Sequence, residues 1–228
     1  MELARERARG DRVYTPTPAW EEAYHLALGA PWPCPHTTPF QDAWDALDGE
    51  LHGTGHGHDA DPTLARAVWC GAIHAQPSQA VEVGVARGVS TRFLLEALAV
   101  NGKGRLWSVD LPPLLEGWRS QVAIAVPSRL RGRWEYVRGP SSRVLPRLLE
   151  RLGPIDFFLH DGLHTEPTLA RELPMVWSHV GPGAPVLVDG IHRSEAFRAF
   201  EQRAQPATTI IAPHEEKRGF LAIALKNA

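Results

Sequence analysis

The segment VEVGVARGVST, residues 81–91, decides the fold class of this chain. It begins as a buried strand that ends at Val83. Gly84 then permits a tight turn and the close approach of a ligand, and Gly88 lets a helix start beside the strand. This order is typical of a βα unit that binds a ligand, although glycines also occupy many βα turns for reasons of geometry alone.

Apolar runs and helical patterns alternate on both sides of this segment. A helix over 62–76 begins at the Asp61-Pro62 pair, which offers an N-cap followed by proline at the first helical position. Such alternation requires crossover connections and predicts a mostly parallel sheet covered on both faces. Strands are expected at 80–84, 106–110, 134–137, 155–160 and 184–190, and helices at 92–100, 118–126, 141–152 and 168–180.

The last part of the chain departs from this alternation. Only HEEKR separates the apolar runs 207–213 and 219–225, which is too short for a crossover helix and predicts an antiparallel hairpin at the sheet edge. We therefore predict an α/β, Rossmann-like fold with a seven-stranded, mostly parallel sheet, a C-terminal antiparallel hairpin and helices on both faces.

Two regions are expected along the chain. Residues 1–61 are rich in Pro, Trp, His and Gly, with short helical pieces at 20–28 and 40–51, and form an N-terminal arm or lid. Within the arm, HGTGHGH (52–58) looks like a metal-binding tract, but its glycines favour a loop. Residues 62–228 form the main domain.

Composition argues against several classes of partner. Lys and Arg number 24 against 26 Asp and Glu, for a net charge of -2, so no strong positive field is available for nucleic acid or anionic lipid. No apolar run or signal-like leader stands out, and two cysteines are too few for a disulfide framework. A cytoplasmic protein is expected.

Two acidic residues indicate what the βα unit binds. Ala86 stands where the dinucleotide fingerprint G-x-G-x-x-G needs its second glycine, which disfavours a nicotinamide dinucleotide. Glu82 is costly to bury alone but suits the ammonium group of a methionine moiety. Asp110 ends the next strand, where a carboxylate can accept both ribose hydroxyls or can simply cap a turn.

Glu82, Gly84, Gly88 and Asp110 together resemble the cofactor motifs of class I S-adenosylmethionine-dependent methyltransferases, and the order of elements matches over residues 62–228. EVGVARGVST and FFLHDGLHTEPTLARELPMVWSHVGPGAPVLVDGIH are similar to bacterial small-molecule O-methyltransferases related to catechol and macrolide-sugar methyltransferases, a group tied to secondary metabolism. The resemblance implies S-adenosyl-L-methionine as cofactor and a small-molecule acceptor. The charge balance and the lack of a long apolar run predict no nucleic-acid or membrane partner, and a homodimer stays open.

The resemblance also implies further cofactor contacts. Ser90 and Thr91 would meet the methionine carboxylate at the helix start, with helix capping as their alternative role. Gly139 and Ser141 lie where the family contacts adenine, although Ser141 also suits an N-cap. His160 belongs with these cofactor-binding candidates.

A third group of residues follows two neighbouring strands and predicts the reaction mouth. Metal-dependent relatives bind a divalent ion through carboxylates at these strand ends, and Asp161 and Asp189 match those positions, with His192 or His164 as a further ligand. Gly190 replaces a usual ligand, so a metal-free mechanism is the alternative, with His164 or His192 as general base and Asp161 as a catalytic group.

Three functions thus stay in competition. The first is methyl transfer to a small molecule at a hydroxyl oxygen. The second is a nicotinamide-dependent oxidoreductase or epimerase on the same fold, against which Ala86 and the terminal hairpin argue. The third is a methyltransferase-like binding protein that has lost its chemistry.

Overall fold

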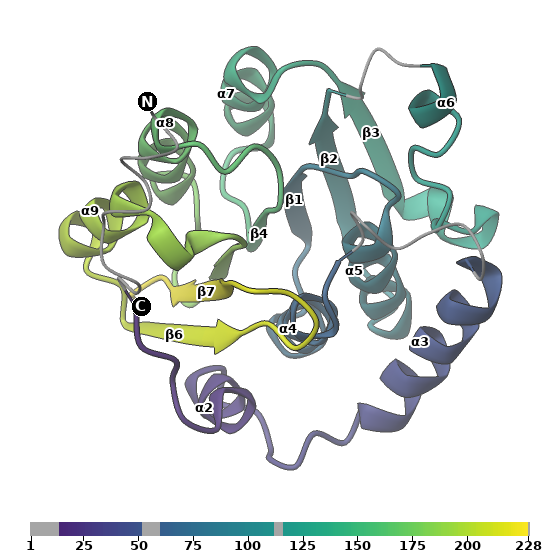
Figure 1. Ribbon diagram of the computed structural model, residues 1–228, viewed down its shortest axis with the longest axis horizontal. Helices are drawn as coiled ribbons and strands as arrows, with labels where there is room; N and C mark the ends of the chain where they lie inside the picture. Colours follow the sequence, from purple (N-terminus) through teal and green to yellow (C-terminus); the bar gives the residue numbers. More distant parts are fainter. Residues whose placement is uncertain (1–13, 52–59, 112–115, 228) are drawn as a thin grey trace.

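The computed structural model describes residues 14–51, 60–111 and 116–227. Seven strands form one sheet in the order β3-β2-β1-β4-β5-β7-β6 (Figure 1). The strands are β1 (Gln79–Val83), β2 (Arg105–Asp110), β3 (Trp134–Arg138), β4 (Phe157–His160), β5 (Pro185–Val188), β6 (Thr208–Pro213) and β7 (Phe220–Leu225).

The helices surround this sheet. They are α2 (Trp20–Ala27), α3 (Thr37–Leu51), α4 (Pro62–Ala75), α5 (Val89–Val100), α6 (Glu116–Arg119), α7 (Ser141–Leu152), α8 (Glu166–Trp177) and α9 (Glu195–Ala204), with short 3-10 turns η1 (Ser128–Arg133) and η2 (Ile191–Arg193). Among the described residues, none of these helices combines the length and apolar character needed to cross a membrane.

Strand pairing confirms the predicted fold class. The pairs β1–β2, β1–β4, β2–β3 and β4–β5 are parallel, whereas β7 is antiparallel to both β5 and β6. Their carboxyl ends therefore share one edge of the sheet, and the βα loops gather there, which is where ligands bind in open α/β sheets.

Side chains that alternate along the strands pack into two apolar cores, one on each face of the sheet. On β4, Phe157 points toward the layer of α2 to α5, while Phe158 points toward α7, α8 and α9. Tyr24 of α2 and Phe40 and Leu47 of α3 are buried in the first of these cores, so the described part of the predicted arm packs onto the sheet's own helices. The predicted boundary at residue 61 stays a prediction, and HGTGHGH lies outside the described residues.

Two elements differ from the sequence-based expectation. The predicted helix over 118–126 is wrong, because only α6 forms there and the chain then turns. Ala123 has a left-handed φ of 57°, and the N–H groups of Ala123 and Ala125 donate to the carbonyls of Ala86 and Arg87 instead of to a helix. Helix α9 was not predicted, although Ser194 caps it through Phe197 N.

Candidate active site

A cavity of about 640 Å³ opens at the carboxyl ends of β1, β2 and β4. We call it the crevice. Its volume lies within the roughly 300–1,000 Å³ typical of sites for small molecules and cofactors. Three predicted site residues, Gly84, Asp110 and Asp161, line it. The other lining residues are Val85, Ala86, Arg87, Gln121, Val122, Gly162 and Leu163.

Gly84 sits where two loops come closest. Its φ is 93°, and a Cβ at this position would collide with the carbonyl oxygen of Asp161. Backbone bonds fix the approach: Gly84 N donates to Val109 O at 2.9 Å, and Asp161 N donates to Val83 O at 2.8 Å. Only glycine meets both requirements, so the turn brings Gly84 and Asp161 to the same wall of the crevice.

Gly88 has a different neighbour. Its φ is 85°, and a Cβ there would press on Val126 and Ala123 at 2.9 and 3.0 Å. The glycine thus makes room for the turning segment after α6. Gly88 is not among the residues that line the crevice.

Glu82 is completely buried at the end of β1. Three hydroxyls donate to its carboxylate: Ser90 at 2.9 Å, Thr91 at 2.8 Å and Ser108 at 2.6 Å. Burial raises the pKa of Glu82 to about 7, although these three hydrogen bonds oppose the shift. In this arrangement Glu82 joins β1 and β2 to the first turn of α5, and its oxygens meet protein hydroxyls.

Asp110 stands at the end of β2 and faces the crevice. Tyr136 on the neighbouring strand donates a hydrogen bond to Asp110 Oδ2 at 3.1 Å. Burial raises the pKa of Asp110, and the Tyr136 bond works against that rise. Tyr136 thereby holds one carboxylate oxygen and orients the group beside the cavity.

His160 and Ser141 are not among the residues that line the crevice, and both contact Glu172 of α8. His160 Nε2 is 3.2 Å from Glu172 Oε2, and Ser141 donates to Glu172 Oε1 at 2.7 Å. Burial alone would raise the pKa of Glu172, but the bonds from His160, Ser141 and Arg171 outweigh it and lower the pKa. Gly139, two residues before Ser141, donates its N–H to Asp110 O at 2.9 Å.

The predicted reaction mouth is partly assembled. Asp161, His164 and Asp189 bring ligand atoms within 4.8 Å of one another, and His164 Nε2 is 4.0 Å from Asp161 Oδ1. Among the described residues, His192 is not in that group. Burial lowers the pKa of His164 to about 4 despite the nearby Asp189 carboxylate, so the ring is neutral and keeps a lone pair at neutral pH.

Two side chains that the sequence did not indicate approach Asp189 from the β6–β7 loop. His214 Nε2 is 2.7 Å from Asp189 Oδ1, and Lys217 Nζ is 3.0 Å from Oδ2. Asp61 lies on the far side of His214, with 3.4 Å between Oδ1 and Nδ1. His214 and Lys217 both belong to the segment HEEKR, which links the two strands of the predicted hairpin. Because β7 pairs with β5, this loop lies at the end of β5, next to Asp189.

These contacts shift the pKa values of Asp189 and Asp161 in opposite directions. Burial would raise the pKa of Asp189, but His214 and Lys217 outweigh it and hold the pKa below its usual range. Burial and the Asp189 carboxylate together raise the pKa of Asp161. A divalent ion between them would have to displace Lys217, because both oxygens of Asp189 already meet nitrogen groups. Metal binding by Asp161, His164 and Asp189 would thus compete with the Lys217 ion pair.

Comparison with known proteins gives one family match. Residues 81–191 match the model of a family described as a methyltransferase domain. The match starts at β1 and ends at η2, so it contains Gly84, Asp110, Asp161 and Asp189. No curated protein sequence matches the chain significantly.

Solved structures share the fold at low sequence identity. The O-methyltransferase TomG of Streptomyces achromogenes, involved in tomaymycin synthesis and solved with SAM, has a TM-score of 0.61 and 19% identity over 82% of this chain and 89% of its own. An O-methyltransferase of Bacillus cereus in complex with SAH has a TM-score of 0.59 and 18% identity, over 86% of this chain and 94% of its own. The SAH-bound methyltransferase PaMTH1 of Podospora anserina has a TM-score of 0.55 and 12% identity, over 96% of this chain and 100% of its own.

Proposed function

We propose, from the premise that this chain carries a methyltransferase domain of the class I type, that it transfers the methyl group of S-adenosylmethionine to a hydroxyl oxygen of a small molecule. The crevice is the observation that carries the proposal. It combines a volume of about 640 Å³ with a glycine turn and an acidic strand end at neighbouring carboxyl ends. Solved relatives of the same fold hold SAM or SAH.

In this proposal the cofactor lies along the crevice. Asp110, already oriented by Tyr136, accepts the ribose hydroxyls. Gly84 lets the methionine end approach the backbone, and Val122 and Leu163 provide apolar surface for the adenine ring. Glu82 acts through Ser90 and Thr91, whose hydroxyls it holds at the start of α5.

Methyl transfer then needs an aligned acceptor and one proton acceptor. We assign proton removal to His164, which is neutral and stands beside Asp161 at the crevice wall. The acceptor's O–H proton passes to His164 as the oxygen forms a bond to the methyl carbon and the carbon–sulfur bond breaks. The electron pair of that bond returns to sulfur, leaving S-adenosylhomocysteine, and the imidazolium releases its proton to solvent.

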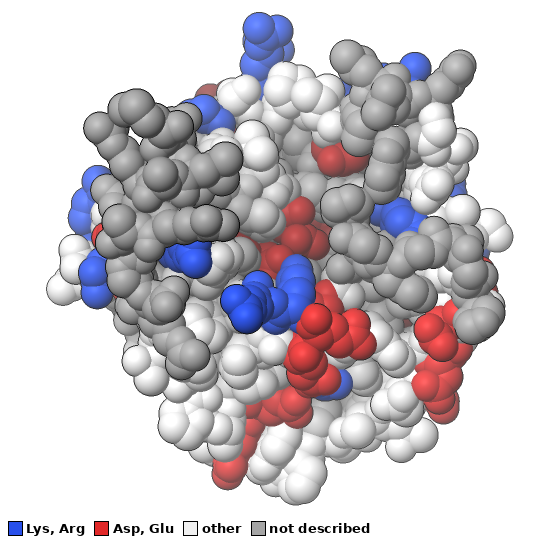
Figure 2. Space-filling model, viewed as in Figure 1, with Lys and Arg blue, Asp and Glu red and all other residues white. Residues whose placement is uncertain are grey.

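Lys217 supplies the positive charge beside Asp189 that a divalent cation would otherwise supply. Its ammonium group balances Asp189 beside the reacting groups, so the proposed reaction proceeds without added metal. On the face shown in Figure 2, basic side chains form small scattered groups among uncharged and acidic surface, which favours a small-molecule acceptor over nucleic acid.

Calorimetry with S-adenosylmethionine, S-adenosylhomocysteine and NAD tests the cofactor assignment. We expect both adenosyl compounds to bind and NAD to fail. Asp110→Ala should weaken S-adenosylmethionine binding roughly tenfold to hundredfold, because a charged hydrogen-bond acceptor is lost. Asp45→Ala, on the exposed side of α3, is the matched control. Tighter binding of NAD would overturn the proposal in favour of an oxidoreductase.

Transfer assays with phenols and sugar alcohols test the chemistry. Activity should persist with a strong chelator in assays run well below the Tm of the chelator-treated protein. His164→Gln should lower kcat while leaving cofactor affinity near that of the unchanged protein. Activity that disappears with chelator and returns with Mg²⁺ contradicts the metal-free assignment. Cofactor binding without transfer to any acceptor supports the non-catalytic alternative instead.

A further inference from the structure

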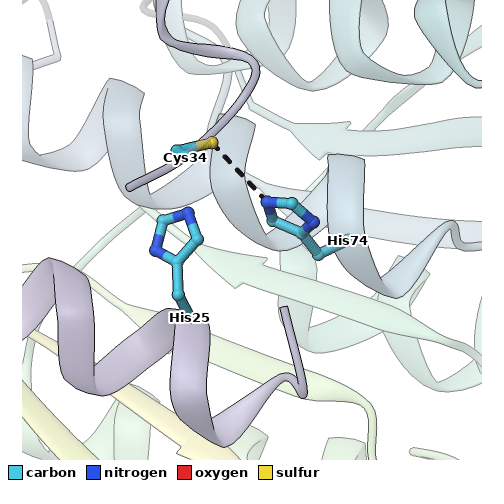
Figure 3. Close-up of side chains that lie close together, drawn as sticks. All are labelled: His25, Cys34 and His74. Carbon is cyan, nitrogen blue, oxygen red and sulfur yellow. Dashed lines mark hydrogen bonds between the residues drawn. The ribbon is translucent and has the colours of Figure 1, made fainter. Parts of the chain in front are cut away.

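A second cluster of metal-binding side chains lies at the opposite end of the sheet from the crevice. It consists of His25 from α2, Cys34 from the α2–α3 loop and His74 from the last turn of α4, and we call it the His-Cys-His cluster. Their ligand atoms all lie within 4.8 Å of one another. Figure 3 shows the three side chains pointing toward one another from these three elements.

The distances suit a tetrahedral metal ion. Zinc bonds to thiolate sulfur at about 2.3 Å and to imidazole nitrogen at about 2.0–2.1 Å, so a tetrahedral angle places the two donors about 3.6 Å apart. Cys34 Sγ and His74 Nε2 are 3.6 Å apart. The pair therefore already has the spacing of two ligands on one zinc ion.

A contact outside the cluster orients the His25 ring for metal binding. Its Nδ1 is 2.7 Å from the backbone carbonyl of Glu21, one turn earlier on α2. A carbonyl can only accept, so Nδ1 carries the proton and Nε2 keeps the lone pair. Metal-binding histidines commonly have their second nitrogen held in this way, which fixes the tautomer and the ring orientation.

A tetrahedral ion needs a fourth ligand, and two more residues lie near the cluster. The His36 ring lies 5.9 Å from the His74 ring, between centroids, on the same loop as Cys34. Cys70 Sγ is 3.4 Å from His25 Nε2 but does not belong to the group whose ligand atoms lie mutually within 4.8 Å. His36 or a water molecule is the better candidate for the fourth ligand, and Cys70 packs behind His25.

We propose that His25, Cys34 and His74 bind one Zn²⁺ ion with a structural role. A thiolate with two imidazoles favours zinc over the hard cations Mg²⁺ and Ca²⁺, which prefer oxygen ligands. The ion would tie α2 and the α2–α3 loop to α4, and hence the N-terminal segment to the methyltransferase domain. His74 precedes the amino end of β1, whereas Gly84 follows its carboxyl end, so this site stands apart from the crevice.

Metal analysis of untagged protein is the direct test. We expect stoichiometric zinc in the purified chain, a lower Tm after removal by chelator, and recovery of Tm when Zn²⁺ is returned. With Co²⁺ in place of zinc, the protein should show the intense d–d bands of a tetrahedral site and a thiolate charge-transfer band. Failure of Zn²⁺ to bind or to raise Tm, or a bound metal other than zinc, would overturn the proposal.

The two cysteines provide a matched pair of variants. Cys34→Ser should abolish the charge-transfer band, whereas Cys70→Ser should retain it, and His74→Gln should weaken Co²⁺ binding. The opposite result for the two cysteines would overturn the ligand assignment. If Cys34→Ser fails to fold, the presence of the band in Cys70→Ser still decides which sulfur binds. S-adenosylmethionine binding, measured on the same samples, reports the crevice separately, so failure of one proposal is distinguishable from failure of the other.

Discussion

The position of Gly84 shows how one residue without a side chain can serve both the fold and the site. Replacing it with Ala adds a methyl group where the Asp161 carbonyl lies and forces alanine into a φ of 93°. We expect Gly84→Ala to lower the free energy of unfolding by about 3 kcal/mol or more, from steric overlap added to backbone strain. Denaturant unfolding measures the loss.

Gly29 supplies the control for that prediction. Its φ is 65°, and a Cβ there meets nothing within 4 Å. Gly29→Ala should therefore cost only about 1 kcal/mol, the part due to left-handed strain. Equal losses in the two variants would mean that contact with the Asp161 loop contributes nothing at Gly84.

Glu82 predicts a specific dependence of stability on pH. Its pKa in the folded chain is about 7, above the ordinary 4.5, so the folded state holds this proton more tightly than the unfolded state. Its contribution to stability is therefore fully present below pH 4.5 and declines as pH rises toward 7. The slope from this group approaches about 1.4 kcal/mol per pH unit within that window.

Glu82→Gln should remove that slope, because the amide does not titrate. The measurement is the free energy of unfolding of both proteins at several pH values inside the window. Glu150→Gln changes the same charge at an exposed site and should leave the slope as it is. Parallel curves for the unchanged chain and Glu82→Gln would show that the buried carboxyl stays ionised throughout.

At the scale of elements, Asp61 connects α4 to the hairpin that carries Lys217. Its carboxylate accepts from Thr63 N at 2.9 Å as the helix cap, and from Glu215 N at 3.1 Å and Glu216 N at 2.8 Å in the β6–β7 loop. Burial would raise the pKa of Asp61, but the bonds from Glu216 and Thr63, together with nearby His214, outweigh it and lower the pKa. The stability it contributes is thus present above its ordinary pKa of 3.8 and lost as pH falls below it.

Asp61→Ala should cost about 2–4 kcal/mol, because three backbone donors lose a charged partner. Ser194→Ala removes an ordinary cap, that of α9, and should cost about 1 kcal/mol. Thermal and denaturant unfolding compare the two variants. Equal losses would indicate that the hairpin loop is held in place by other contacts.

Local pattern predicted most elements, and contacts distant in sequence account for the exceptions. Residues 141–152 were predicted as a helix from their own pattern, and α7 has those bounds. The helix expected at 118–126 fails because its backbone bonds to the Ala86–Arg87 turn, a partner that its own sequence does not reveal. The contact of Lys217 with Asp189 cannot be predicted from local pattern either, because it depends on β7 entering the sheet beside β5.

At the scale of the whole molecule, the first apolar core crosses the predicted boundary between arm and domain. Tyr24, Phe40, Leu47 and Leu51 are each no more than 5% exposed and pack with α4 and α5. Burying a large apolar side chain contributes roughly 2 kcal/mol, and net domain stability is only about 5–15 kcal/mol, so losing these contacts would be felt. We therefore expect α2 and α3 to fold together with the rest of the chain.

A chain starting at residue 62 tests this conclusion and the predicted boundary together. We expect it to lack a cooperative thermal transition, because the face of α4 against α2 and α3 would be exposed to water. Leu47→Ala in the full chain should lower stability by about 2–5 kcal/mol, whereas Leu26→Ala, at a side chain that is 67% exposed, should change it little. A truncated chain that unfolds cooperatively at the Tm of the full chain would show that residues 62–228 are a domain in their own right, with the arm merely resting on it.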